Sequence, residues 1–135
     1  MRPNMMRMLL VAATVLGAGT ALAQDAEIGA RIYMQYCATC HGTAGDGRGP
    51  LTELMTVKVP DLTQLSATND GEFPMLRVIH IIDGRTGVRG HGGPMPTYGD
   101  IFTAELPGDV GPYTASVATR GRMLSLALYL ESIQK

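Results

Sequence analysis

The chain has 135 residues, of which 45% are hydrophobic and 17% are charged, and its formal net charge is −1. This length favours a single domain, and so small a net charge excludes the strongly basic surface of a protein that binds nucleic acid. The 17 glycines and 8 prolines indicate long irregular connections, and no segment alternates apolar and polar residues as a strand does. We therefore expect an all-α fold with long loops rich in Gly and Pro.

Residues 1–23 have the features of an export signal. Arg2 and Arg7 form a positive start, an apolar stretch follows, and Ala21-Leu22-Ala23 is an A-x-A cleavage site. The apolar stretch of about 16 residues is shorter than the ~20 that span a bilayer, so we expect a cleaved signal and no stable membrane insertion. We predict a periplasmic protein whose domain comprises residues 24–135. Cleavage removes two of the 11 basic residues and none of the 12 acidic ones, which leaves a net charge of −3.

Residues 25–36 are predicted to form the first helix of this domain. Ile28, Ile32 and Tyr36 recur every four residues, which places them on one face of a helix. Asp25 lies where a side chain can cap the start of the helix. The predicted helix leads directly into the two cysteines of the chain.

A Gly-rich loop is predicted for residues 42–60, followed by a brief helical turn over residues 60–65. Residues 72–83 are predicted to form a second helix. Pro74 suits the first turn of this helix, and Gly84 suits the position just after its end.

Residues 84–113 hold eight Gly and four Pro, and we therefore expect a long loop there. The last and clearest predicted helix covers residues 115–134. Thr114 is its expected N-cap, and Gly121 is expected to weaken its first half.

The sequence Cys37-Ala38-Thr39-Cys40-His41 is a C-x-x-C-H motif, which is typical of covalent haem attachment. Two thiols add across the two haem vinyl groups, and two intervening residues let both sulfurs reach one edge of the ring. The next residue places its imidazole beneath the iron, so His41 is predicted to be the proximal axial ligand. We therefore predict one haem c bound through Cys37 and Cys40.

Three other uses of the two cysteines explain the motif less well. A thioredoxin-like dithiol normally follows a strand, whereas this pair follows a predicted helix. A structural zinc site needs four ligands, and two Cys and three His without paired spacing are a poor set. A disulfide between residues three apart would close a very small loop, would stabilise little and would leave His41 unexplained.

Three further stretches accompany the haem motif and the Gly29-x-x-x-Tyr33 that precedes it: Gly47-Arg48-Gly49-Pro50, Gly93-Pro94-Met95-Pro96 and Leu126-x-x-Tyr129. Together they resemble the class I c-type cytochromes, the monohaem cytochrome c family, over nearly the whole chain after the signal. The resemblance implies a small cytochrome c fold, with three to five helices wrapped around one covalent haem. It also implies that Gly29 and Tyr33 cross the last helix near Leu126 and Tyr129.

Met95 is predicted to be the distal axial ligand of the iron. Pro94 and Pro96 restrict the backbone on either side of it, and the preceding Gly92-Gly93 allow close approach to the ring. The resemblance implies a Met ligand in a loop of this kind. A Met/His pair of ligands raises the reduction potential, so we expect a positive midpoint.

Other side chains compete less well for the distal position. Met55 lies in the earlier loop, and His91 would give bis-His ligation in place of Met95. His80 lies in a predicted apolar helix, where a buried and hydrogen-bonded residue, or one at the edge of the core, is a simpler interpretation than a ligand. Met34 precedes Cys37 by one helical turn, which anchors it close to the wrong side of the ring. Met75 and Met123 lie on predicted helices, where core packing explains them more simply.

Roles are also expected for residues around the haem. The resemblance implies that Pro50 supplies a backbone carbonyl to the free N–H of His41, which fixes the ring and increases its basicity. Tyr98 is expected to contact the haem ring or a propionate, and Arg85 and Arg89 are candidates to pair with the propionates.

These features predict an electron carrier and not an enzyme. No nucleophile–base pair suggests catalysis, and a haem closed on both axial faces suits one-electron transfer with little ligand movement. The expected partners are redox proteins, including membrane-bound oxidase or reductase complexes, and the expected state is a monomer. Two alternatives stay open: a haem-containing subunit of a larger oxidoreductase, and a haem enzyme or gas sensor with a displaceable sixth ligand.

Overall fold

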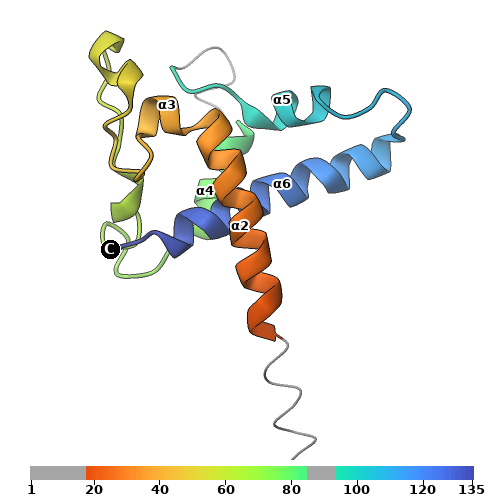
Figure 1. The fold of residues 1–135 in the computed structure, drawn as a ribbon, viewed down its shortest axis with the longest axis horizontal. Coiled ribbons are helices and arrows are strands. Elements are labelled where there is room, and N and C mark those ends of the chain that lie inside the picture. The colour runs from red at the N-terminus through yellow and green to blue at the C-terminus, as the bar shows by residue number, and fades with distance from the viewer. Residues whose placement is uncertain (1–17, 85–93) are drawn as a thin grey trace, which may run out of the picture.

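A computed structural model describes residues 18–84 and 94–135 of the chain. These residues form five α-helices and two short 3₁₀ helices, and none of them lies in a strand (Figure 1). In chain order the helices are α2 (Ala18–Tyr36), α3 (Ala38–His41), η1 (Pro50–Leu54), η2 (Leu62–Gln64), α4 (Met75–Asp83), α5 (Tyr98–Ala104) and α6 (Pro112–Ser132). The predicted all-α fold is confirmed.

Helices α2 and α6 cross near the centre of the fold, as Figure 1 shows. Gly29 lies at the crossing, where a β-carbon would run into the backbone carbonyl of Ser125 on α6. One turn further along α2, the fully buried Tyr33 packs against Tyr129 with ring centroids 5.1 Å apart. The missing side chain lets the two backbones approach closely, and this packing offsets the ~1 kcal/mol that a helical Gly costs. The expected crossing of Gly29 and Tyr33 with the last helix is confirmed.

One hydrophobic core joins the five α-helices. Helix α6 contributes four of its buried members, and α4 and α5 pack against α6 from other sides. Cys37 belongs to this core, so a group attached to its sulfur would lie inside the fold and not on its surface. The buried apolar residues are Ile32, Tyr33, Cys37, Ala38, Val78, Ile82, Tyr98, Phe102, Met123, Leu126, Ala127 and Leu130.

Two short helices occupy segments that were predicted to be loops. Helix α5 interrupts the predicted loop at residues 84–113, with Thr97 as its N-cap and a fully buried Phe102. The 3₁₀ helix η1 lies inside the predicted loop at residues 42–60. The seven residues of α5 and the five of η1 are too few to show an apolar period, and flanking Gly and Pro mask them further.

The longer predicted helices are present with shifted ends. Helix α2 begins at Ala18 and runs through the predicted cleavage point. Helix α6 begins with Pro112 in its first turn and Gly111 as its N-cap, so the prediction of Thr114 as the N-cap is wrong. Proline fits a first turn because the N–H that it lacks would have no helical partner there. Gly84 ends α4 in the left-handed conformation with φ 90°, as predicted.

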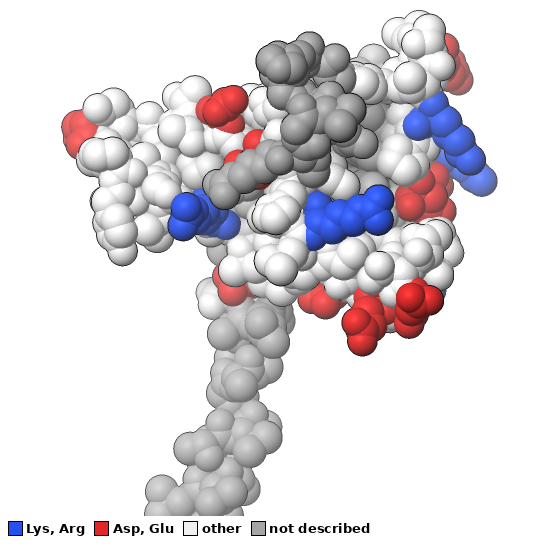
Figure 2. Space-filling view, turned by 180° about the vertical axis from the view of Figure 1, so that it is seen from behind, with Lys and Arg blue, Asp and Glu red and all other residues white. Residues whose placement is uncertain are grey.

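Two features concern contacts with membranes and nucleic acids: the length of the helices and the distribution of charged side chains on the surface. Within residues 18–84 and 94–135, no helix is both long enough and apolar enough to cross a membrane. On the face that Figure 2 shows, acidic and basic side chains are scattered among uncharged ones. That face has no extended basic area of the kind that contacts with a phosphate backbone need.

Candidate haem site

The haem motif lies at a break between two helices. Helix α2 ends at Tyr36, and the single turn of α3 covers Ala38–His41. Hydrogen bonds of 2.8 Å run from the Cys37 N–H to the Tyr33 carbonyl and from the His41 N–H to the Cys37 carbonyl, so the helical spacing continues through the break. This spacing places Cys37 and His41, four residues apart, on the same side of the helical turn.

The His41 ring is buried, and its Nδ1 lies 3.3 Å from the backbone carbonyl oxygen of Pro60. A carbonyl only accepts hydrogen bonds, so Nδ1 carries the proton and Nε2 keeps the lone pair that a metal needs. Burial lowers the pKa of His41, and the hydrogen bond to Pro60 only partly opposes this effect. The imidazole is therefore neutral near pH 7, as iron ligation requires.

The prediction that Pro50 holds His41 is wrong, because the carbonyl comes from Pro60. Pro50 is exposed and begins η1. The loop folds back on the motif through bonds from the Gly47 N–H to the His41 carbonyl (2.8 Å) and from the Gly49 N–H to the Cys40 carbonyl (3.1 Å).

Pro60 reaches His41 because the end of the same loop is fixed a second time. The Leu62 N–H donates to the Gly45 carbonyl at 2.7 Å. The Asp61 side chain accepts from the Thr63 N–H at 2.8 Å and so caps η2. The sequence holds a signal for this choice. Pro60 is followed by Asp61, which caps η2, whereas Pro50 is followed by Leu51.

Two adjoining cavities border the motif, with volumes of about 410 and 120 Å³. Both are lined by His41, Pro60, Met95 and Tyr98, so the two cavities lie side by side and together make up the crevice beside the motif, of a size usual for a ligand site. The larger cavity also contacts Tyr36, Cys40, Met55, Val57, Lys58, Val59, Pro94 and Pro96. The smaller one also contacts Tyr33, Cys37, Leu62, Leu65, Val78, Ile81, Ile82, Leu126 and Leu130. A mostly apolar crevice bordered by two thiols, one neutral imidazole and two thioethers fits a covalently attached haem.

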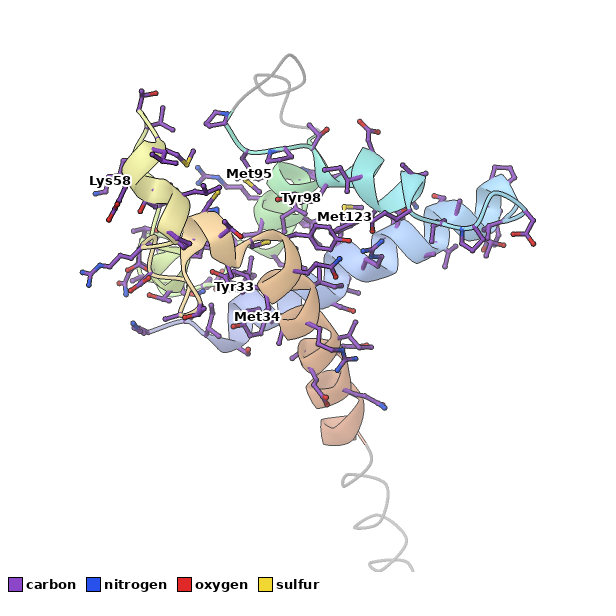
Figure 3. All side chains as sticks on the ribbon, turned by 45° about the horizontal axis from the view of Figure 1, so that its top comes forward. Tyr33, Met34, Lys58, Met95, Tyr98 and Met123 are labelled. Carbon is purple, nitrogen blue, oxygen red and sulfur yellow. The ribbon has the colours of Figure 1, made fainter. Side chains whose placement is uncertain are left out.

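The structure brings Met95 to the same crevice as His41, although 53 residues separate them in the sequence. Met95 is half-buried and packs against the core, and Figure 3 shows it beside Tyr98. Two residues after Met95, the Thr97 side chain lies so close to the left-handed Gly84 that a β-carbon on Gly84 would collide with it. The predicted ligand pair therefore lies on one crevice.

The other candidates for the distal position and for the propionates divide into four groups. Met55 lines the larger cavity and is the alternative sulfur. Met34 is exposed on α2, whereas Met75 and Met123 pack in or against the core, and none of the three borders the crevice (Figure 3). His80 is exposed on α4. The candidates that lie outside the described residues are His91, Arg85 and Arg89.

Tyr98 borders both cavities with its ring, but its hydroxyl is already engaged. The hydroxyl donates to the backbone carbonyl of Tyr36 at 2.8 Å, so its direction is toward the end of α2. Burial raises the pKa of Tyr98 to about 12, and the phenol stays neutral at all ordinary pH values. The hydroxyl is thus occupied within the protein, and the contact of Tyr98 with the haem stays a prediction.

The two cysteines differ from a reactive dithiol. Burial, with a smaller effect of Cys40, raises the pKa of the Cys37 thiol to about 12. Redox-active C-x-x-C pairs instead have a thiol with a lowered pKa, so this environment disfavours a thioredoxin-like role. Among residues 18–84 and 94–135, no group of three or more His, Cys, Asp or Glu side chains is placed to hold a metal ion. The zinc alternative therefore has no support in the described part of the chain.

The family model for cytochrome c oxidase, cbb3-type, subunit III matches residues 24–107. The chain belongs to this cytochrome c family. No curated protein and no solved structure matches it. The match spans the haem motif, Pro60 and Met95, and it ends before α6. As a class I c-type cytochrome, the protein binds haem and takes part in electron transfer.

Proposed function

We propose that this cytochrome is a periplasmic electron carrier that transfers one electron at a time through a single haem c. Cys37 and Cys40 hold the haem, and His41 and Met95 ligate its iron. The observation that carries the proposal is that all four side chains border one apolar crevice. Haem c, when bound, supplies a reversible one-electron couple.

The chain's own groups suit a carrier with a positive midpoint potential. Burial keeps His41 neutral, and the Pro60 carbonyl orients its ring. The Met95 thioether is also neutral, so neither axial group compensates the extra positive charge of the ferric state. The apolar walls of the crevice disfavour that charge further, because a low dielectric penalises ions.

One side of the crevice is open to partners. The larger cavity is lined by exposed residues at its rim: Val57, Lys58, Pro94 and Pro96. An edge of the haem seated there would lie close to the surface, where a redox protein makes a small and transient contact. Nothing in this arrangement requires a substrate site, and we propose a carrier and not an enzyme.

Export and cleavage after Ala23 agree with the packing of α2. The family match begins at residue 24, and from that residue onward the first buried residue of α2 is Gly29. Figure 1 shows the first turns of α2 extending away from the other helices. Residues 1–17 of the proposed signal lie outside the described residues. Cleavage would leave the α2–α6 crossing and the haem crevice intact, as a monomeric domain.

A haem-containing subunit of a larger oxidoreductase is the second candidate. The description of the matching family, an oxidase subunit, favours it. Apolar side chains that a partner would cover are exposed near the crevice, with Leu54 81% exposed and Leu51 and Val57 partly so. Purification without detergent or denaturant as a monomer supports the carrier, whereas constant recovery with other chains supports the subunit.

The test is maturation in a periplasm that contains the haem-attachment machinery, followed by absorption spectroscopy and a redox titration. We expect a low-spin haem with two thioethers, a positive midpoint and slow binding of CO to the reduced protein. Cys40→Ala is expected to lose normal attachment, while Met34→Ala, an exposed change on α2, is the matched control. Colourless protein contradicts the proposal, and a high-spin ferric spectrum with fast CO binding supports the enzyme or sensor.

A further inference from the structure

A polar cluster joins three helices beside the haem crevice. The Tyr36 hydroxyl on α2 donates to the Glu105 carboxylate and lies 2.7 Å from each of its oxygens. The Arg122 guanidinium on α6 donates to the same carboxylate at 2.9 Å. It also lies over the Phe102 ring of α5, with 4.1 Å between the guanidinium carbon and the ring centroid. The cluster thus connects residues separated by up to 86 positions in the sequence.

Tyr36 belongs both to this cluster and to the crevice wall. Its side chain lines the larger cavity together with Cys40 and His41. Its backbone carbonyl accepts the Tyr98 hydroxyl, and the two rings meet edge to face at 5.9 Å. A shift of Tyr36 would therefore move two aromatic rings of the proposed haem site.

The ion pair in the cluster is more enclosed than an ordinary surface pair. The side chains of Arg122 and Glu105 are 25% and 40% exposed, whereas those of the Arg31–Glu27 pair on α2 are 66% and 74% exposed. The hydrogen bond from Tyr36, and then the one from Arg122, hold the pKa of Glu105 below its ordinary value. Both charges are thus present near neutral pH. Arg122 is partly buried and Glu105 is exposed, so solvent screens the Arg122 charge less than it screens either member of the Arg31–Glu27 pair.

We propose that Glu105 and Arg122 are positioning residues that hold Tyr36 in the crevice wall, and that their opposite charges act on the reduction potential of the haem. This proposal rests on the proposed haem site. Oxidation adds one positive charge to the haem. An Arg122 cation without its partner would disfavour oxidation, and a Glu105 carboxylate without its partner would favour it.

The experiment is a redox titration of haem-loaded single and double variants. Glu105→Gln, which keeps the size of the side chain, is expected to raise the midpoint potential. Arg122→Gln is expected to lower it, and the double variant is expected to return toward the wild-type value. Arg122→Lys keeps the charge and should stay closer to the wild type than Arg122→Gln does. Midpoint shifts of opposite sign in the two single variants indicate a charge effect, because a loss of packing alone would not give them.

The matched controls are Glu27→Gln and Arg31→Gln, which break an exposed pair of the same two residue types with a 3.0 Å contact. Their midpoint shifts should be several-fold smaller than those of the cluster variants. Midpoint shifts of the same sign in Glu105→Gln and Arg122→Gln, or shifts no larger than those of the controls, overturn this proposal and leave the proposed function standing. A wild-type protein without bound haem overturns this proposal and the proposed function together.

Discussion

The two halves of α6 lie in different surroundings. The C-terminal half carries the buried Met123, Leu126, Ala127 and Leu130 and meets α2 at close range. The N-terminal half carries the 53% exposed Val117 and meets α5 through polar contacts, among them a 3.0 Å hydrogen bond between the Thr103 and Thr119 hydroxyls. One helix therefore forms a wall of the haem crevice at its C-terminal end and makes polar contacts with α5 at its N-terminal end.

The two regions of α6 are therefore expected to affect different properties: the C-terminal half affects the stability of the fold, and the region near Arg122 affects the charge around the haem. Leu126 and Leu130 border the smaller cavity, so the tightly packed half fixes the shape of the haem site. Arg122 lies between the halves, and its partner Glu105 is on the side of α5. Changes in the C-terminal half should therefore cost stability, whereas changes near Arg122 should alter the haem with smaller effects on folding.

Gly29→Ala is expected to have the largest effect. Its β-carbon would meet the Ser125 carbonyl, and neither helix backbone can withdraw without opening the core. Overpacking of this kind costs about 3 kcal/mol of unfolding free energy. Urea unfolding of the haem-loaded protein, followed by far-UV circular dichroism, measures it. A loss below about 1 kcal/mol would show that the crossing is looser than described.

Leu126→Ala tests the same half by creating a cavity instead of a clash. Leu126 is 1% exposed, and truncating such a side chain costs about 3 kcal/mol. Val117→Ala, in the exposed half, is the control and should change the unfolding free energy by less than about 0.5 kcal/mol. The same unfolding experiment reports both values. Equal losses at the two positions would remove the contrast between the halves of α6.

Gly121→Ala is expected to stabilise the protein. Gly121 is an exposed helical residue, and a β-carbon there would meet nothing within 4 Å. Alanine should add about 0.5–1 kcal/mol through its higher helix propensity. The sign is thus opposite to that of Gly29→Ala, although both change a helical Gly to Ala. A destabilised Gly121→Ala variant would indicate a contact in the N-terminal half that the structure does not show.

The smallest expected effect is a change in acid stability in Glu105→Gln. The pKa of Glu105 is lower in the folded state than its ordinary value, because the Tyr36 hydroxyl and Arg122 bind the carboxylate. Its contribution to stability is therefore complete above the ordinary carboxyl range and is lost as pH falls through the lowered pKa. Wild type and variant should differ at neutral pH and converge in acid. A gap that stays constant across the acid range would assign the effect to packing.

The haem motif could be recognised because its signal is local, whereas the helix crossing was expected from the family resemblance and is confirmed by the packing of Gly29 on Ser125. The spacing of Cys37, Cys40 and His41 is enough to indicate attachment, and Gly29 and Tyr33 share one helix face. The sequence also led to Met95 through its flanking prolines. The inferences on the haem motif and on Met95 each use residues within one turn or one short loop.

The remaining features depend on contacts between distant segments. Pro60 replaces Pro50 because hydrogen bonds such as that from Leu62 to Gly45 set the path of the loop. The buried Phe102 holds helix α5 against the core, and a segment of seven residues is too short to show this burial as a helical pattern in the sequence. The contact between Tyr36 and Glu105 spans 69 residues and carries no sequence signal.

The identity of the distal ligand is tested most directly by the weak sulfur-to-iron absorption band at the red end of the ferric spectrum. We predict that the wild type and Met55→Ala show this band and that Met95→Ala loses it. Met55 lines the same crevice, so the comparison holds the surroundings constant while it changes the sulfur. A band that survives in Met95→Ala, or that disappears in Met55→Ala, would contradict the assignment of Met95.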